Sequence, residues 1–282
     1  MSSHVSRPLA IVTGASSGLG LAIARQFLAS GYDVAGVARD SARLEQATQS
    51  FQLLPEVSGP MFYPFVADVA DAAAVSQLFT QIGERFGRIH VLINCVGQSD
   101  RGSVEGLKSE RVNELIQTNV ISALLCSQAA LPWLEATGGV IVNIGSLASK
   151  VGARHLGAYP IAKHALAGLT QQMRLEWRER GVHVALISPG PIRRDDAGER
   201  YRALESSGIP QEAMRPGGGT SLKGLDPDWI AKQVLRCVKR RAPDVILPRF
   251  IRLMVALGHS WPRLGDRVLL AMTKKSGKNE RT

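Results

Sequence analysis

The strongest constraint on this chain is a regular alternation of short β-branched runs with longer stretches that have helical spacing. Such alternation is typical of an α/β protein, in which crossover helices join parallel strands. Near-continuous apolar runs indicate strands that are buried on both faces of a sheet. Six runs fit this description: Leu9–Thr13, Val34–Ala38, Phe62–Val66, Val91–Asn94, Val140–Ile144 and Val182–Ile187. We therefore expect one parallel sheet, to which Asp244–Leu247, closed by Pro248, adds an edge strand.

Helical patterns occupy the intervals between these runs, and their lengths suit crossover helices. They cover residues 18–30, 39 to about 53, 72–86, 109–136, 157–180 and 226–241. With 45% hydrophobic and 21% charged residues, the 282-residue chain can bury a large core. Because the sequence has no repeat and no linker, we expect a single domain over residues 1–248, followed by a tail over residues 249–282.

The net charge of +10 is concentrated at one end of the chain. Residues 231–282 contain 13 of the 34 Lys and Arg residues and 3 of the 24 Asp and Glu residues, so the first 230 residues are balanced at 21 of each sign. A concentrated charge block of this kind indicates what kind of surface the tail contacts, and it says nothing about the fold. Only 5% of the residues are aromatic and available to stack on bases, so no nucleic-acid partner is expected.

Cysteine usage and the amino terminus favour a cytoplasmic protein. Cys95, Cys126 and Cys237 are far apart and form no CxxC pair, so we expect packing residues rather than a disulfide scaffold or a metal site. The polar segment Met1–Arg7 is followed by only a short apolar run, unlike a secretory signal. No run of 18 uninterrupted apolar residues indicates a helix that spans a membrane.

The turn after the first expected strand reads Thr13-Gly14-Ala15-Ser16-Ser17-Gly18-Leu19-Gly20 and leads directly into a helix. Glycines allow a tight turn and let backbone N–H groups approach a pyrophosphate at the positive end of a helix. Their spacing differs from the commonest G-x-G-x-x-G pattern, and a glycine-rich turn without a ligand is the alternative. We predict that a dinucleotide is bound by Gly14, Ser16, Ser17, Gly18, Leu19 and Gly20.

Charged residues follow the next two strands, where a crevice at the switch point of the sheet would hold adenosine. Arg39 follows the second strand, and an arginine there suits the 2′-phosphate of NADP(H), whereas an acid would bind the 2′-hydroxyl of NAD(H). Asp40 competes with this interpretation unless it caps the following helix. Asp68 and Val69 follow the third strand and are predicted to bind the cofactor, although Asp68 could instead cap the next helix. We expect NADP(H) to be preferred, with NAD(H) as the alternative.

Three polar residues in the second half of the chain form one chemical pattern: Ser146 after the fifth strand, then Tyr159 and Lys163. Tyr159 and Lys163 are four residues apart, so they share one face of a helix. A tyrosine with a pKa near 10 is a poor acid or base at pH 7, but a nearby ammonium favours the phenolate and lowers that pKa. Each residue alone is unremarkable on a turn or helix, whereas the three together downstream of a glycine loop point to acid–base chemistry.

These motifs together resemble those of the short-chain dehydrogenase/reductase family, over residues 7–248. The resemblance rests on Thr13–Gly20, Asn94–Gly97, Asn119, Ser146, Tyr159-Pro160-Ile161-Ala162-Lys163 and Pro189-Gly190. It implies a Rossmann-type, doubly wound parallel sheet in the order 3-2-1-4-5-6-7. It also implies hydride transfer between a nicotinamide and a carbonyl group or a secondary alcohol.

The resemblance further implies a role for each matching catalytic residue. Tyr159 would be the general acid/base, and Lys163 would lower the pKa of Tyr159 and bind the ribose of the cofactor. Ser146 would orient the carbonyl group, and Asn119 would hold a water molecule of a proton relay.

The further residues that the resemblance assigns to the cofactor lie at the ends of the fourth and sixth expected strands: Asn94, Gly97, Pro189, Gly190 and Ile192. Two departures from the family pattern bear on them. Cys95-Val96 replaces the usual Asn-Ala, so the packing differs while the backbone role is expected to persist. Arg194 stands where a threonine is common, and it could reach the cofactor phosphates or face solvent, so it stays unassigned.

Two segments depart from the alternation of strands and helices. Residues 191–225 have no clear periodicity and are expected to form a substrate lid. In the tail, apolar residues repeat at helical spacing beside arginines and lysines, which predicts two short basic amphipathic helices. The apolar positions are Phe250, Leu253, Met254 and Leu257, then Leu264, Val268, Ala271 and Met272. Their apolar faces would pack on the body, on another subunit of a homodimer or homotetramer, or on the cytoplasmic face of a membrane.

We therefore expect an NADP(H)-dependent oxidoreductase that acts on a small-molecule carbonyl or secondary alcohol, apolar or lipid-like in character. An alternative is a cytosolic 3-oxoacyl-thioester reductase, whose acidic carrier protein would meet the basic tail. A different class of function is a nicotinamide-binding sensor or scaffold without turnover. The retained Asn119, Ser146, Tyr159 and Lys163 speak against this last class, because a binder needs no tyrosine with a tuned pKa.

Overall fold

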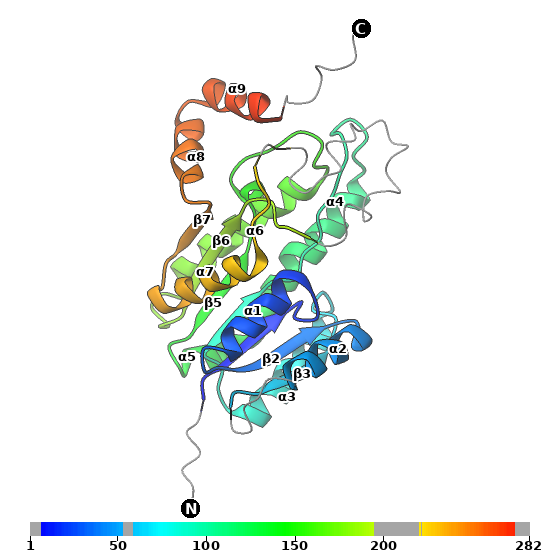
Figure 1. The fold of residues 1–282 in the computed structure, drawn as a ribbon, viewed down its shortest axis with the longest axis vertical. Helices are drawn as coiled ribbons and strands as arrows, with labels where there is room; N and C mark the ends of the chain where they lie inside the picture. The colour runs from blue at the N-terminus through cyan, green and yellow to red at the C-terminus, as the bar shows by residue number, and fades with distance from the viewer. Residues whose placement is uncertain (1–6, 53–58, 195–219, 221, 274–282) are drawn as a thin grey trace, which may run out of the picture.

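The computed structural model describes residues 7–52, 59–194, 220 and 222–273. Its centre is a seven-stranded parallel sheet in the order β3-β2-β1-β4-β5-β6-β7 (Figure 1), which confirms the expected Rossmann-type topology. The strands are β1 (Leu9–Thr13), β2 (Asp33–Ala38), β3 (Phe62–Val66), β4 (Val91–Asn94), β5 (Val140–Ile144), β6 (His183–Pro189) and β7 (Asp244–Leu247).

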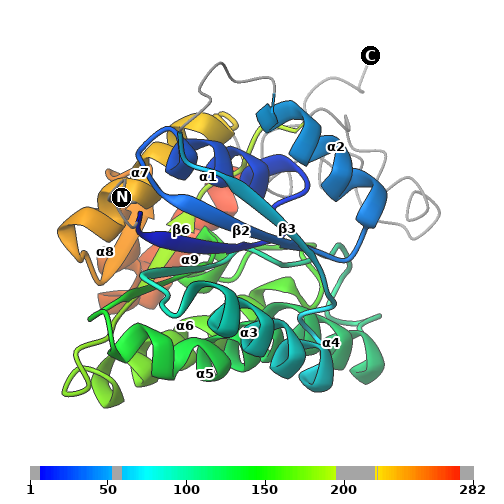
Figure 2. The same cartoon turned by 90° about the horizontal axis from the view of Figure 1, so that it is seen from below.

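Helices cover both faces of the sheet (Figure 2). One face carries α1 (Gly18–Leu28), α2 (Ser41–Gln52) and α7 (Pro227–Arg240), and the other carries α3 (Ala72–Phe86), α4 (Ser109–Ile116), α5 (Ser122–Glu135) and α6 (Tyr159–Glu176). Alternate residues of β1 enter different cores, since Ala10 and Val12 pack with α1, whereas Leu9 and Ile11 pack with α3 and α5. Because successive side chains of a strand point to opposite faces of the sheet, a strand that is buried on both faces needs an apolar residue at every position.

Two sequence predictions need correction. The strand β3 is only partly buried, with Val66 exposed, because it is the edge of the sheet and not one of its inner strands. The helix expected over residues 109–136 is interrupted by a π-helical turn, η1 (Gln117–Ile121), between α4 and α5. The stretch Ser109–Glu135 is long and apolar enough to cross a membrane, yet in the structure it packs against α3, α6 and the sheet.

The chain continues after β7 into two short helices, α8 (Ile251–Ser260) and α9 (Pro262–Thr273), as the tail pattern predicts. They form a hairpin at the carboxyl end of the sheet (Figure 1). Gly258 and Gly265 meet where the helices cross, and a Cβ atom on Gly265 would lie 2.8 Å from Cα of Gly258. Ile251 and Val255 are buried against Ile246 of β7, so the inner face of the hairpin belongs to the body of the protein.

Candidate active site

The turn between β1 and α1 uses its three glycines for steric reasons. Gly14 and Gly18 have φ angles of +71° and +52°, in the left-handed region that favours glycine. A Cβ atom on Gly20 would overlap the carbonyl oxygen of Gly14. Ser17 and Gly18 are exposed at the start of α1, and Ser16 is half-buried beside them. The open, positively polarised end of α1 therefore fits the pyrophosphate of a dinucleotide.

Thr13 ties this turn to the loop that follows β4. Its Oγ1 accepts hydrogen bonds from the backbone N–H groups of Cys95 and Val96, at 3.0 and 3.3 Å. The segment Asn94–Gly97 is thereby held beside the glycine turn, at the point where the strand order reverses between β1 and β4. Ligands of doubly wound sheets bind in the crevice at this point.

Ser146, Tyr159 and Lys163 come together near the carboxyl end of β5. Ser146 precedes the 3-10 turn η2 (Leu147–Ser149), and its Oγ accepts the backbone N–H of Ala148 at 3.2 Å. Tyr159 is the first residue of α6, and Lys163 lies one turn later on the same face. Lys163 Nζ is 5.8 Å from the centre of the Tyr159 ring. Ser146 and Tyr159 line one cavity, so the geometry is compatible with both reaching the same substrate atom.

The ammonium group of Lys163 is buried beneath this cavity. It donates a hydrogen bond to the carbonyl oxygen of Ile144 at 3.0 Å. Burial lowers the pKa of Lys163 from 10.5 to about 8, against a smaller opposing influence of Cys95. The same environment raises the pKa of the Cys95 thiol to about 12, so this cysteine stays neutral, as expected of a packing residue.

Asn119 is buried within the π-helical turn η1, a kind of turn that is frequent at functional sites. Its Nδ2 donates to the carbonyl oxygens of Gln98 and Leu115, at 3.0 and 2.9 Å, and its Oδ1 accepts the backbone N–H of Gln98 at 3.2 Å. A Cβ atom on Gly97 would lie 2.7 Å from Asn119 Oδ1 and 3.1 Å from Lys163 Nζ. Glycine at position 97 therefore lets the side chains of Asn119 and Lys163 both lie against the backbone of this loop.

Asn94, which we predicted to line the cofactor, has its side chain inside the protein. Its Nδ2 donates to Asn143 Oδ1 at 2.8 Å and to Ser127 Oγ at 3.0 Å. Asn143 in turn donates to Thr170 Oγ1 at 2.9 Å. These bonds join β4 and β5 to α5 and α6. A contact between Asn94 and the cofactor would therefore have to use the main chain, and that role stays a prediction.

Arg39 and Asp68, both predicted to bind the cofactor, face each other at the ends of β2 and β3. Arg39 Nη1 lies 3.4 Å from Asp68 Oδ2, and the Arg39 side chain is 73% exposed. Asp40 accepts the backbone N–H of Arg43 at 3.0 Å, so it caps α2 and does not compete for the ribose in this structure. An exposed cation beside the adenosine end of the crevice can reach a 2′-phosphate.

The alternative reading of Asp68 as the cap of α3 is wrong, because Asp71 has that position. Asp71 Oδ1 accepts the backbone N–H of Ala74 at 2.8 Å. Asp68 instead accepts the backbone N–H of Ala70 at 2.9 Å, which fixes its side chain at the rim of the crevice. Val69 beside it is buried.

Asp100 holds the segment that leads into Tyr159. Its carboxylate accepts two hydrogen bonds from Arg111, at 3.1 and 3.2 Å, and one from the backbone N–H of Ala158 at 3.0 Å. A Cβ atom on Gly157 would overlap the Asp100 carboxylate. Because Ala158 directly precedes Tyr159, this buried carboxylate is a positioning residue for the start of α6.

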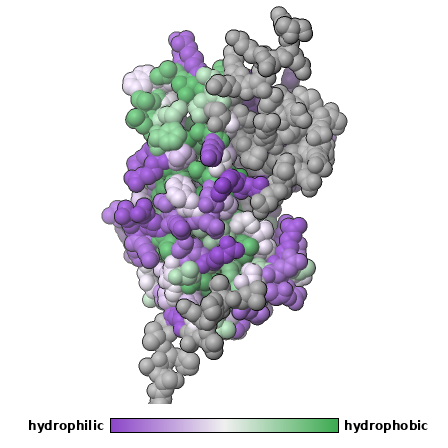
Figure 3. All heavy atoms as spheres, viewed as in Figure 1, coloured by the Kyte–Doolittle hydropathy of each residue, from purple (hydrophilic) through white to green (hydrophobic). Residues whose placement is uncertain are grey.

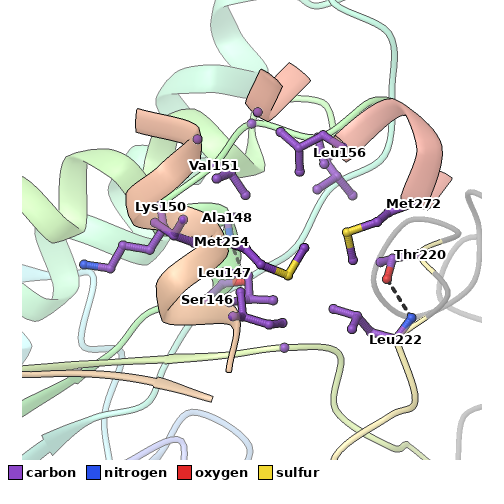
Figure 4. A pocket seen from close by; sticks show the side chains of 18 of the residues that line it. Ser146, Leu147, Ala148, Lys150, Val151, Leu156, Thr220, Leu222, Met254 and Met272 are labelled. Carbon is purple, nitrogen blue, oxygen red and sulfur yellow. Dashed lines mark hydrogen bonds between the residues drawn. The ribbon is translucent and has the colours of Figure 1, made fainter. Parts of the chain in front are cut away.

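A cavity of about 670 Å³ opens above Ser146 and Tyr159. It is lined by Pro189, Gly190 and Ile192, which we predicted to bind the cofactor, and also by Arg194. Much of the opposite wall comes from α8 and α9 (Figure 4), where Met254 and Met272 point into the cavity. Lys150, although it lies at the edge, directs its ammonium group away from the cavity to Asp244 (Figure 4). Volumes of about 300–1,000 Å³ are usual for small-molecule sites.

Sequence reasoning missed two parts of this site. After Gly97, the loop that follows β4 has no recognisable motif in the sequence, yet Asp100 and Arg101 of this loop are buried, and Arg101 lines the cavity. Met254 and Met272 of the tail also line the cavity, whereas the tail pattern predicts only that its apolar faces pack on the body, on another subunit or on a membrane. The presence of apolar residues on more than one flank of α8 was the available signal. Most of the predicted lid, residues 195–219 and 221, lies outside the described residues.

Comparison with known proteins gives a consistent result. The family model described as short chain dehydrogenase matches residues 8–204. The dehydrogenase/reductase SDR family member 7B of Danio rerio is 29% identical over 282 residues, which cover 98% of this chain and 89% of that protein. The farnesol dehydrogenase of Aedes aegypti is 34% identical over 221 residues, which cover 73% of this chain and 88% of that protein.

A solved structure resembles the fold closely. The alcohol dehydrogenase of the archaeon Thermococcus sibiricus, complexed with 5-hydroxy-NADP, has a TM-score of 0.69 and is 27% identical in sequence. The match covers 85% of this chain and 95% of that chain. The likeness therefore extends over nearly the whole sheet and its crossover helices.

Proposed function

We propose a function from the premise that this chain belongs to the short-chain dehydrogenase/reductase family. As a member it is an oxidoreductase that uses a nicotinamide cofactor and acts on the alcohol or carbonyl group of a small molecule. Our proposal within this activity is that NADP(H) is the preferred cofactor and that the substrate is apolar.

The chain's own residues supply the proton chemistry of this reaction. When bound, the nicotinamide supplies or accepts the hydride at the carbonyl carbon. In the reductive direction, the Tyr159 hydroxyl gives its proton to the carbonyl oxygen, and the Ser146 hydroxyl donates a hydrogen bond to the same oxygen. Lys163, one helical turn from Tyr159, favours the phenolate that remains. Asn119 holds the backbone of Gln98 beside Lys163 and is the proposed site of the relay water.

The composition of the cavity wall is the observation that supports an apolar substrate. Ser146 and Tyr159 supply the reactive hydroxyl groups, and charged residues such as Arg101 and Arg194 also line the cavity, whereas Met254, Leu269 and Met272 of the hairpin give it a largely apolar wall. Apolar lining with a few polar groups favours a ligand with one reactive polar group and a hydrocarbon body. The name of the farnesol dehydrogenase relative, an enzyme of an apolar alcohol, is consistent with this proposal.

The experiment that tests the substrate class is a panel of ketones and aldehydes of increasing alkyl length, followed by the loss of NADPH absorbance. We expect kcat/KM to rise with chain length until the cavity is filled. A 3-oxoacyl thioester and a polyhydroxylated ketone of similar size serve as comparisons. Higher kcat/KM for either of these than for every apolar ketone would contradict the proposal.

The preference for NADP(H) rests on Arg39 and on the NADP-type ligand in the related archaeal structure. Replacing Arg39 with alanine should raise the Kd for NADPH about tenfold and leave the Kd for NADH almost unchanged, because only NADPH carries the 2′-phosphate. Arg43→Ala, which removes a nearby exposed arginine from α2, is the matched control. Equal affinity of the unaltered protein for both cofactors would refute the preference.

A further inference from the structure

The outward side of the α8–α9 hairpin carries large apolar side chains that nothing in the described chain covers. Phe250, Leu253 and Trp261 are 63%, 67% and 60% exposed. In the space-filling view, hydrophobic residues gather over this hairpin at the top of the molecule (Figure 3). Exposed aromatic and aliphatic residues in one patch, unlike isolated ones, mark an interaction surface.

Helical spacing places these residues on one flank of α8. Phe250, Leu253, Leu257 and Trp261 follow one another at intervals of three, four and four residues, so they form a single stripe. The buried residues Ile251 and Val255 lie on a different side, against the body. The hairpin therefore has two apolar faces, an inner one that packs on the body and an outer one that is left open.

Cations surround the outer stripe. Arg249 just before α8 and Arg252 on it flank the stripe, and Arg263 and Arg267 are exposed on α9. Within the described chain, no salt bridge involves any of these four arginines. Asp266 is the acidic residue of the two helices, so the surface is strongly cationic. A cationic rim around exposed apolar residues is complementary to an anionic surface with an apolar interior.

Two other occupants of this stripe are less favourable. A second copy of the chain would bring the same four arginines against each other around a twofold axis, and like charges repel at such an interface. The end of the chain after α9, residues 274–282, contains three lysines and an arginine but no large apolar side chain to cover the stripe.

We propose that the outer face of the α8–α9 hairpin binds the surface of an anionic lipid bilayer, with Phe250, Leu253 and Trp261 inserted among the lipids. The hairpin lies across the membrane surface as an amphipathic anchor and does not span it, because α8 has only 10 residues. The arginines meet the lipid phosphates, and this face places the protein at the membrane.

The proposed surface adjoins the substrate cavity. Leu257 of the stripe and Leu264 at the start of α9 are exposed and also line the cavity. Apolar contact therefore continues from the outer stripe to Met254 inside. An apolar substrate dissolved in the bilayer would meet this route before it meets bulk water, a consequence that rests on the substrate class proposed above.

The test is flotation of the full chain with vesicles of phosphatidylcholine alone or of phosphatidylcholine mixed with phosphatidylglycerol. We expect the chain to float with the mixed vesicles, to bind vesicles of phosphatidylcholine alone at least tenfold more weakly, and to be released by added salt. No flotation with anionic vesicles at low salt would overturn the proposal.

Two variants test whether the vesicles bind to this face of the hairpin. Leu253→Glu should reduce vesicle binding at least tenfold, and so should the double variant R263Q/R267Q, since each arginine near an anionic surface is worth about fivefold in affinity. Leu175→Glu is the matched control, because Leu175 on α6 is 65% exposed and far from the hairpin in sequence. Binding that survives both hairpin variants, or that is lost equally in the control, would refute the assignment.

Two further measurements separate this proposal from its rivals. Light scattering of Leu253→Glu should give the same mass as the unaltered chain, and a smaller assembly would show that the stripe is a subunit interface instead. Turnover of a short water-soluble ketone without vesicles should be unchanged, because Leu253 does not line the cavity. The flotation result is independent of turnover, so the failure of either proposal can be recognised without the other.

Discussion

The two ends of the candidate site are built in different ways. At the cofactor end, Gly20 faces the backbone of Gly14 and Gly97 faces the side chains of Asn119 and Lys163, so neither glycine has room for a side chain, and Thr13 fixes the loops with hydrogen bonds. At the substrate end, one wall includes methionine and leucine side chains on a hairpin that packs on the body through Ile251 and Val255. We therefore expect the cofactor end to tolerate few substitutions, whereas the substrate end can change shape while the fold is kept.

The largest effect is expected at the junction of the two ends. Tyr159→Phe should reduce kcat by about 10²–10⁴-fold, because the ring still packs but has no proton to give. The Kd for NADPH should change little. Stopped-flow or steady-state turnover together with fluorescence titration of NADPH measures both quantities. Turnover at the unaltered rate would refute the role of Tyr159.

A pair of glycine substitutions compares the two ends directly. Gly20→Ala should weaken NADPH binding at least about tenfold and lower the thermal midpoint, since the new methyl group overlaps backbone atoms of Gly14. Gly265→Ala adds the same methyl group where α8 and α9 cross. We expect it to shift the hairpin and raise KM for long ketones, with the Kd for NADPH unchanged. If Gly265→Ala impaired NADPH binding as strongly as Gly20→Ala, the two ends would not be independent.

A smaller effect is expected when the hairpin wall is trimmed. Met272→Ala should lower kcat/KM for long-chain ketones about fivefold and leave short ketones nearly unaffected, because only the long substrates reach this side chain. The ratio of kcat/KM for long and short ketones measures this change. Leu270→Ala, on the exposed side of the same helix, is the control. An equal loss for all chain lengths would place the methionine outside the substrate path.

The last prediction concerns the stability of the fold, pH and the buried lysine. The pKa of Lys163 is lowered from 10.5 to about 8 in the folded state, so between these values the unfolded chain binds more protons than the folded one. Stability should therefore rise with pH in this window relative to Lys163→Met, and the cost of burying the cation should be full below about pH 8. Urea denaturation of both proteins at pH 7 and pH 10 measures it. A difference between them that did not depend on pH would contradict the lowered pKa.

The same contrast explains what sequence could predict. Apolar runs such as Leu9–Thr13 and Val140–Ile144 predict strands because burial on both faces leaves no other pattern, and the positions of Ser146, Tyr159 and Lys163 follow from where strands and helices begin and end. Asp100 could not be found, because a charged residue after a strand has no local mark of burial. The spacing of apolar residues in α8 also does not predict which side of the helix lines the cavity, because that side is determined by packing against β7 and η2.

The π-helical turn at Asn119 has a consequence for how the long helix can vary. A π-helical turn is equivalent to one residue inserted into an α-helix, so the residues before and after it are out of phase by about 100°. Leu115, upstream, packs with Ala162 of α6, as does Ala123 just after the turn, whereas Cys126 and Ala130 farther downstream pack into the core on this face of the sheet. The extra residue therefore sets which side of α4 and which side of α5 point toward the protein interior. Removal of a single residue, such as Thr118, would restore an ideal helix and rotate α4 relative to α5. One continuous helical stretch thereby carries both Asn119 of the candidate site and the core residues of α5, each with the orientation that its own contacts require.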